Sequence, residues 1–447
     1  MSAVGQERLT EAAEAAFGAS ADGTLIVAIH SWGGLTRFAS SRIHQNTWRE
    51  DVEFRVMTIV DGNKLGVAAT HSLDPAAVRR AADDAIAIAR VAPSDPDFPG
   101  LAAAATIAAD DGFDPDTAEA TPAARAAAVA TMLGEFPSGM EGAGYVETVA
   151  DEVLIASSNG LRAFASTTRS GCSVLAIASD SSGYVERLER RFGQIDPGSL
   201  ARTAVDKATR SANPQPVDAG TWTVILEPAA TGTFLQFLGY LGFGAKSFIE
   251  ERSFLTGKIG SKLMGDLVTI TDDPTAPDAL GLPFDFEGTP SQRVSLIDAG
   301  VASGVVWDRA TAKKAGKEST GHGLPPPNPY GPLPLNMRMA PGSSTIDEMI
   351  ASTERGLLVT RFHYSNVVNE KETVLTGMTR DGTFLIEDGK LGGGVRNLRY
   401  TQNAVEALAN VQMVGDETEI STEMFFGGSR APAVKIADFK FSSTTTH

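Results

Sequence analysis

The sequence predicts an α+β fold: an antiparallel N-terminal sheet with covering helices, followed by a mainly antiparallel, β-rich C-terminal half. Segments typical of helices and of strands alternate before residue 144, and the region 144–192 is typical of strands almost throughout. The turns inside that region are too short for parallel crossovers, which need a dozen or more residues. With 42% hydrophobic and 21% charged residues, the 447-residue chain can bury a large core.

The N-terminal elements follow from local signals. An Ala- and Glu-rich segment predicts a first helix over 8–19, and Asp61-Gly62-Asn63 predicts a hairpin turn between two strands. Asp74 followed by Pro75, and Thr121 followed by Pro122, are typical of a helix N-cap and first turn. The predicted strands are 24–30, 37–44, 53–60 and 64–69, and the predicted helices after the first begin at 75 and 122 and span 200–212.

A polar, proline-bearing stretch at 213–220 predicts a boundary between two domains, 1–215 and 219–447. After the boundary we expect strands and turns with one or two helices, at 229–241 and 345–354. Six prolines in the eleven positions 324–334 predict a stiff, extended strap.

Composition excludes several classes of protein. The net charge of −17 argues against a nucleic-acid binder, which needs a basic face. Cys172 is the single cysteine and is expected to be buried, so no intramolecular disulfide can form. The N-terminus lacks the apolar run of a signal peptide, and the apolar stretch 228–245 is too rich in glycine for a membrane helix. We expect a cytoplasmic protein without membrane contact.

Motifs of catalysis are scarce. The six histidines are far apart in sequence, and neither H-E-x-x-H, a phosphate-binding G-x-x-x-x-G-K-[ST], nor G-x-S-x-G occurs. A Ser/His/Asp triad or a metal site built from distant residues stays open.

Four segments nevertheless occur in a distinctive order. They are DFEGTP at 285–290, KESTGH at 317–322, MAPG at 339–342 and RGLLVTRF at 355–362. Together with GTFLIEDGK at 382–390, this ordered set resembles the TldD/PmbA (TldD/TldE) metalloprotease family over residues 50–440. The resemblance implies a fold shared with that family.

Within that family, TldD-type chains carry H-E-x-x-x-H on the helix after the first C-terminal strand, and a further cysteine ligand near the C-terminus. Here the strand is 223–226, and the aligned positions hold Gln236, Phe237 and Leu241. The segment 420–430 has no cysteine. Because these side chains can neither bind zinc as imidazole does nor act as a general base, the chain resembles the PmbA/TldE-type subunit.

The resemblance implies a non-catalytic pseudoenzyme subunit of a cytoplasmic heterodimer, with no cofactor of its own. Zinc is then expected in a TldD-like partner, and the pair would cleave or mature an extended peptide, which this chain helps to hold, for example by β-augmentation. Weak substrate-binding candidates are His322, which is expected in an exposed loop, with Glu287 and Arg293, which could instead pair with each other. The alternatives are a metal-free hydrolase or lyase of a biosynthetic pathway, or a homo-oligomeric peptide-binding protein; without a partner, a homodimer is expected.

Overall fold

The computed structural model describes residues 3–108, 112–421 and 428–444. It confirms the α+β class: an N-terminal antiparallel sheet with helices precedes a larger, mainly antiparallel C-terminal sheet. No helix in the described ranges is both long and apolar enough to cross a membrane.

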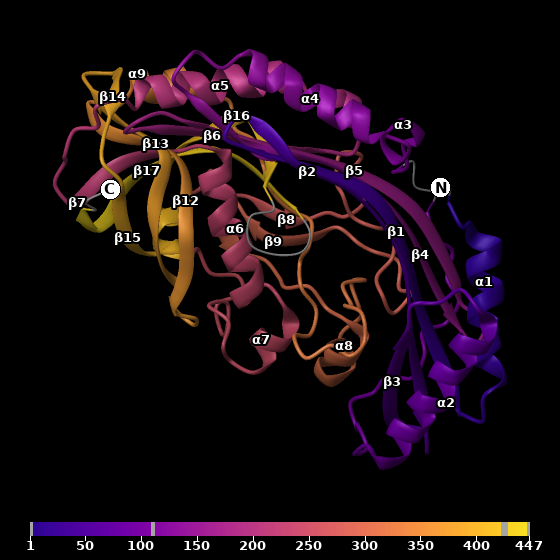
Figure 1. Cartoon of the computed structure of the whole chain (residues 1–447). Helices are drawn as coiled ribbons and strands as arrows, with labels where there is room; N and C mark the ends of the chain where they lie inside the picture. Colours follow the sequence, from indigo (N-terminus) through magenta and orange to yellow (C-terminus); the bar gives the residue numbers. More distant parts are fainter. Residues whose placement is uncertain (1–2, 109–111, 422–427, 445–447) are drawn as a thin grey trace.

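The N-terminal sheet has six strands in the order β3-β2-β1-β4-β5-β6, and every neighbouring pair is antiparallel. In Figure 1 it arches over the C-terminal half, with α4 and α5 on its outer side. The strands are β1 Gly23–Ala39, β2 Arg42–Val60, β3 Lys64–Thr70, β4 Glu141–Ser157, β5 Arg162–Ile177 and β6 Ser182–Glu189. The helices are α1 Gln6–Glu14, α2 Pro75–Val91, α3 Pro115–Ala118, α4 Pro122–Gly134 and α5 Pro197–Arg210, with 3₁₀ turns at Ala15–Gly18 and Phe192–Gln194.

Side-chain caps set the starts of these helices, as the sequence predicts. Asp74 accepts a hydrogen bond from the Ala76 N–H and Thr121 accepts one from the Ala124 N–H. The helices cover one face of the sheet, and its other face packs through Leu25, Met57 and Ile155 against the C-terminal Phe284. The sheet is therefore buried on both sides over much of its area.

One N-terminal prediction is wrong. The expected strand 37–44 spans a turn, because Ser40 and Ser41 both have positive φ (48° and 57°) and reverse the chain between β1 and β2. The separate short strands expected on either side are parts of one long hairpin. β1 continues through Gly33 and Gly34 without a break. Glycine is required at position 33, because a Cβ there would lie 2.2 Å from the Thr148 carbonyl oxygen of β4.

The C-terminal half is an eleven-stranded sheet in which β17 pairs with both β15 and β7, closing a ring through β13 and β12. Its strands are β7 Gly220–Leu226, β8 Ile270–Asp272, β9 Val294–Asp298, β10 Val301–Ala302, β11 Met337–Met339, β12 Arg355–Asn369, β13 Val374–Glu387, β14 Lys390–Gly394, β15 Leu398–Asn403, β16 Val411–Ser421 and β17 Ser429–Thr444. The helix α6 Pro228–Gly242 packs on this ring, and its Phe234 ring lies 5.5 Å from that of Phe362 and 6.0 Å from that of Phe439.

Helices are more numerous in this half than the one or two expected. Besides α6 and α9 Ile346–Ala351, the structure has three short ones, α7 Ala245–Ile249, α8 Arg309–Ala315 and α10 Ala404–Ala409. These have five to seven residues, too few for a periodic apolar pattern to be visible in the sequence.

Candidate functional site

Helix α6 carries the three positions aligned with the zinc motif. Gln236, Phe237 and Leu241 are only 6%, 3% and 5% exposed, and the Gln236 side-chain amide donates a hydrogen bond to the Ser421 carbonyl at 2.9 Å. A carboxamide that donates to the backbone, a phenyl ring and an isobutyl group do not fit a zinc ion, which takes imidazole, thiolate or carboxylate ligands.

No group of three or more His, Cys, Asp or Glu side chains able to hold a metal ion occurs in the described parts of the chain. Residues 422–427 of the expected cysteine-free segment lie outside those parts. Cys172 is buried as expected, and burial raises its pKa to about 12, so the thiol is protonated at neutral pH.

His322 is buried, at 6% exposure, and not exposed in a loop as the sequence suggests. Its Nε2 lies 2.8 Å from Oδ2 of the fully buried Asp272 in β8. Its Nδ1 lies 2.9 Å from both the hydroxyl and the carbonyl oxygen of Thr320. Both ring nitrogens thus have partners, which fixes the ring and leaves neither nitrogen free as a base in this conformation.

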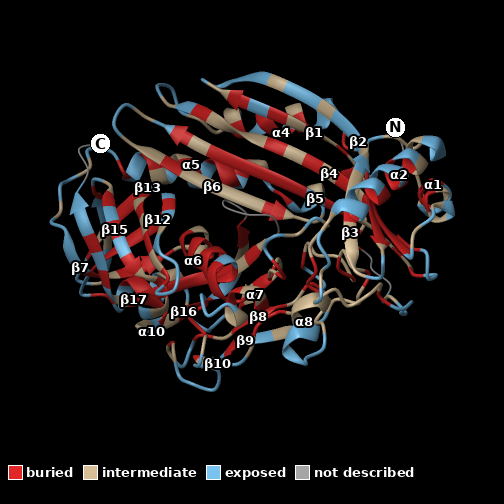
Figure 2. Ribbon diagram, turned by 90° about the horizontal axis from the view of Figure 1, so that it is seen from below, coloured by how far each residue is buried: buried red, intermediate tan, exposed pale blue. Residues whose placement is uncertain are grey.

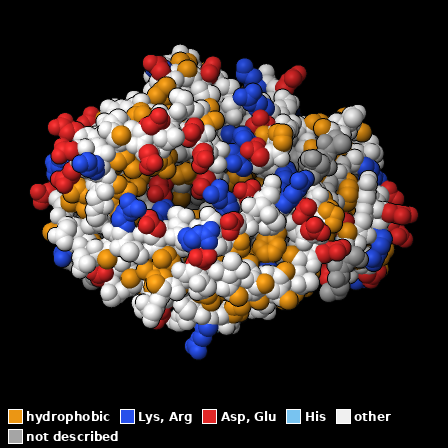
Figure 3. All heavy atoms as spheres, turned by 90° about the horizontal axis from the view of Figure 1, so that it is seen from above, with side chains coloured by type: hydrophobic (Ala, Val, Ile, Leu, Met, Phe, Trp, Pro, Cys, Tyr) orange, Lys and Arg blue, Asp and Glu red, His pale blue; other side chains and the backbone are white. Residues whose placement is uncertain are grey.

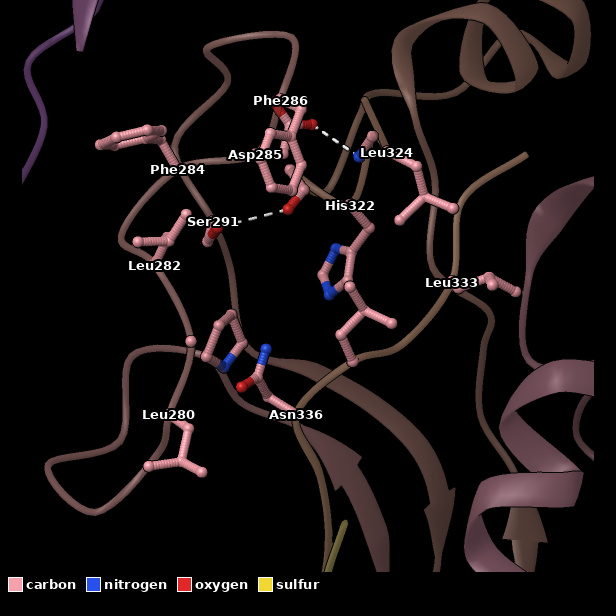
Figure 4. A pocket seen from close by; sticks show the side chains of 15 residues that line it. Leu280, Leu282, Phe284, Asp285, Phe286, Ser291, His322, Leu324, Leu333 and Asn336 are labelled. Atoms are coloured by element: carbon pink, nitrogen blue, oxygen red, sulfur yellow. Dashed lines mark hydrogen bonds between the residues drawn. The ribbon is translucent and has the colours of Figure 1, made fainter. Parts of the chain in front are cut away.

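His322 lines a small pocket of about 170 Å³ together with Asp285, Phe286 and Ser291 (Figure 4). Asp285 accepts hydrogen bonds from the N–H groups of Glu287, Thr289 and Gly323, which hold the DFEGTP turn in place. Burial nevertheless raises the pKa of this carboxyl to about 6.

Glu287 is half-buried beside that turn, and its Oε2 accepts a hydrogen bond of 2.9 Å from the Arg309 N–H at the start of α8. Burial, and then the nearby carboxylate of Asp285, raise the pKa of Glu287. Gly323 permits the close packing here, because a Cβ at this position would lie 2.7 Å from Glu287 Cγ.

A larger cavity of about 490 Å³ lies between the N-terminal sheet and the C-terminal loops, and Glu287 and Arg309 line it. Its apolar wall comes from both halves of the chain: Leu25, Met57, Leu65, Val67, Phe98, Leu101, Phe286, Leu324, Pro326 and Pro327. The Arg309 guanidinium donates to the carbonyl oxygens of Gly100 (2.5 Å) and Leu101 (3.3 Å) and so fixes one wall. An apolar cavity with a few polar groups and a carboxyl of shifted pKa is the usual form of a ligand site.

Arg293 does not join this cavity. Its side chain is 67% exposed and lies 3.6 Å from Asp273, so the Arg293–Glu287 pair that the sequence left open as an alternative does not form. The structure therefore brings His322 and Glu287 close to one turn and separates Arg293 from them. Asp272 and Arg309 were missed, because Asp272 lies 50 residues before its histidine and only the fold joins them.

The raised pKa of Glu287 gives a testable pH dependence. A folded-state pKa above the unfolded value stabilises the protein at low pH, and this contribution is lost as the pH rises through the folded pKa. We expect Glu287→Gln to gain about 1–2 kcal/mol of stability relative to the parent chain between pH 5 and pH 9, after allowance for partial exposure. Urea unfolding at several pH values measures this.

The matched control is Glu318→Gln, at an exposed glutamate that precedes the proline-rich stretch 324–334. The free energy of unfolding of this variant should differ from that of the parent chain by the same amount at every pH measured. If the gain in unfolding free energy from Glu287→Gln does not grow with pH, the pKa of Glu287 is not raised in the folded protein.

Charged side chains are mixed on the surface. On the face seen in Figure 3, Lys and Arg side chains are scattered among Asp and Glu and form no continuous basic area. This face offers no electrostatic match to a nucleic-acid backbone.

Comparison with known proteins gives consistent matches. Residues 219–443 match the model of the PmbA/TldA metallopeptidase C-terminal domain, and residues 110–212 match that of its central domain. A metalloprotease of Methanothermobacter thermautotrophicus is 27% identical over 66% of this chain and 66% of its own length, and the metalloprotease PmbA of Escherichia coli O157:H7 is 26% identical over 87% of each.

Among solved structures, TldE from Thermococcus kodakarensis superposes with a TM-score of 0.87 at 22% identity. The superposition covers 97% of this chain and 99% of that one. At this identity the likeness shows a common fold.

Proposed function

Because this chain belongs to the PmbA/TldD metallopeptidase family, we propose that it is a non-catalytic subunit of the TldE type, which acts with a zinc-bearing subunit of the TldD type. The observation that carries the proposal is the chemistry of α6. At the three aligned positions the helix presents Gln236, Phe237 and Leu241, each buried in the packing of the C-terminal half. A helix with this surface stabilises the fold and has no group to activate water.

The cavity beside Glu287 supports a share in holding the peptide substrate. Its walls come from both halves of the chain and are mainly apolar, and Glu287 adds one hydrogen-bonding group. An extended peptide could bury an apolar side chain there, with its backbone bonded at the rim. The substrate class proposed is therefore a peptide with an apolar residue.

The test measures zinc per chain and peptide hydrolysis for this chain alone, and again with a TldD-type chain. We expect neither bound zinc nor hydrolysis for the chain alone, and about one zinc per pair with hydrolysis when the two are combined, because one set of ligands is present. Stoichiometric zinc or turnover in the chain alone would overturn the proposal.

A matched variant is Phe237→Leu, at the position aligned with the general-base glutamate of the motif. Because Phe237 is proposed to serve packing only, hydrolysis by the pair should stay within about twofold of the parent value, in line with the small cost of such core substitutions. A loss of a hundredfold or more without a loss of folding would assign the side chain a catalytic part.

A metal-free hydrolase or lyase is the second candidate, and the His322–Asp272 pair beside a pocket favours it. Such a pair can orient an imidazole for proton transfer, and His322 would then act through Nδ1 after a change of conformation has separated that nitrogen from Thr320. Turnover by the metal-depleted chain alone, lost in His322→Gln while the fold is retained, would support this candidate over the first.

A further inference from the structure

The rim of the N-terminal sheet has an unpaired stretch of strand. β2 has 19 residues, but β3 pairs only with residues 54–60 of it. Over 42–53, β2 pairs with β1 on one side, and no backbone pairing to the other side occurs among residues 3–108, 112–421 and 428–444. Figure 2 shows this part of β2 at the rim, mostly as exposed residues. Roughly half of its backbone N–H and C=O groups are thus available to another strand.

The opposite edge of the same sheet is covered. On β6, Arg187 forms an ion pair with Glu419 of β16 at 2.6 Å, and Ser182 donates to Asp381 of β13 at 2.7 Å. The C-terminal sheet therefore protects the β6 edge. Beside the first half of β2, the described residues contribute side-chain contacts, from Asn46 to the Pro122 carbonyl and from His71 to Asp51, and no paired strand. Exposed edges of this length are usually blocked or paired in native proteins.

The charges along this edge are divided between its two ends. Residues 42–49 carry Arg42, His44 and Arg49 and no acidic side chain, while residues 50–53 carry Glu50, Asp51 and Glu53 and no basic one. An antiparallel copy of the same strand places the basic end of each beside the acidic end of the other. The pattern is self-complementary, which favours a second copy over an unrelated strand.

We propose that residues 42–52 of β2 pair antiparallel with the same residues of a second copy of this chain, about a twofold axis at Thr47. Two copies of one strand in the same sheet are related by a twofold axis perpendicular to that sheet. Paired residues point to the same face, and side chains alternate along a strand, so the sequence numbers of two paired residues differ by an even number. Centred on Thr47, it sets His44 opposite Glu50 and Gln45 opposite Arg49 of the second copy. No like charges face each other, and a Thr47–Thr47 pair lies on the axis.

This register also suits the neighbouring strand. An axis closer to the C-terminal end of β2 would bring the second copy into the space of Thr70, the β3 residue that pairs with Phe54. The proposed dimer joins two six-stranded sheets into one continuous sheet. It concerns the association of this chain with itself and is independent of the function proposed above.

The experiment is a cross-link by a single cysteine. In Thr47→Cys the two thiols meet at the axis, where opposite Cα atoms of an antiparallel pair are about 4.5–5.5 Å apart, within the range of a disulfide. Oxidised glutathione accepts the two electrons and two protons and is itself reduced to two thiols. The native Cys172 is buried and does not compete.

The control is Ile43→Cys, at an exposed side chain of the same strand. In the proposed register its two copies lie eight residues apart along the strand, about 26 Å, which is too far for a disulfide. We expect a covalent dimer from Thr47→Cys at a rate at least tenfold above that of Ile43→Cys. Equal rates, or no covalent dimer from either variant, would overturn the proposal.

Sedimentation of the unaltered chain gives a second measurement. We expect a monomer–dimer equilibrium at micromolar concentration that shifts toward monomer at high ionic strength, since salt screens the paired charges. A chain that remains monomeric throughout would contradict a second copy as occupant of this edge. Association with an added TldD-type chain in the absence of any self-association would contradict it as well. That result would leave the zinc and hydrolysis test unaffected.

Discussion

Replacement of Phe234 by alanine is expected to lower the free energy of unfolding by about 3–5 kcal/mol, as for other large aromatic side chains in cores. Phe234 is fully buried on α6 and stacks against Phe362 and Phe439, with Tyr400 at its edge. The substitution leaves a void among these rings, which come from three different strands of the closed ring. Urea unfolding monitored by circular dichroism measures the loss.

Phe234→Leu is the control, because it retains most of the volume and should cost less than about 1.5 kcal/mol. If alanine and leucine cost the same, the site is not a tightly packed centre of the C-terminal core. If both are neutral, α6 does not hold the ring of strands together, and the structural role proposed for this helix fails with it.

Replacement of Asp272 by alanine is expected to cost about 3–5 kcal/mol as well, for a different reason. Asp272 is fully buried; its Oδ2 is paired with His322 and its Oδ1 accepts a hydrogen bond of 2.8 Å from the Asn336 N–H. Alanine leaves Nε2 of the buried His322 without a partner and removes the acceptor of the partly buried Asn336 N–H, and a buried polar group without a hydrogen bond is costly. Thermal and urea unfolding of the variant measure the effect.

The next residue along the chain gives the matched control. Asp273 pairs with the largely exposed Arg293 and accepts hydrogen bonds from the N–H and hydroxyl of Thr275, so Asp273→Ala should cost about 1–2 kcal/mol, clearly less than Asp272→Ala. The double variant Asp272→Ala with His322→Ala should cost clearly less than the sum of its single changes, because the two side chains share one interaction. Additive costs would show that they are not coupled.

Much of the fold could be predicted from short-range signals. The caps at Asp74 and Thr121 and the Asp61–Asn63 turn are confirmed, because each depends on a few neighbouring residues. The turn at Ser40–Ser41 was missed, because two serines with positive φ carry no strong turn signal. Its position is fixed by the register of β1 with β2 and β4.

The sequence by itself determined the chemistry available on α6. Whatever the fold, Gln236, Phe237 and Leu241 offer neither an imidazole nor a carboxylate, since this follows from residue type alone. The order of the family segments also determined the family, because it needs no knowledge of contacts.

Only the tertiary structure decided where the remaining polar groups lie. It buried His322 against Asp272 and gave Glu287 its apolar cavity wall from the N-terminal sheet. In the described part of the chain it also left the first half of β2 paired on one side only, with β1. Each of these features joins residues that are distant in the chain, or depends on where a neighbouring strand stops. Burial, pKa and edge exposure arise from such long-range packing, and local sequence patterns carry no record of it.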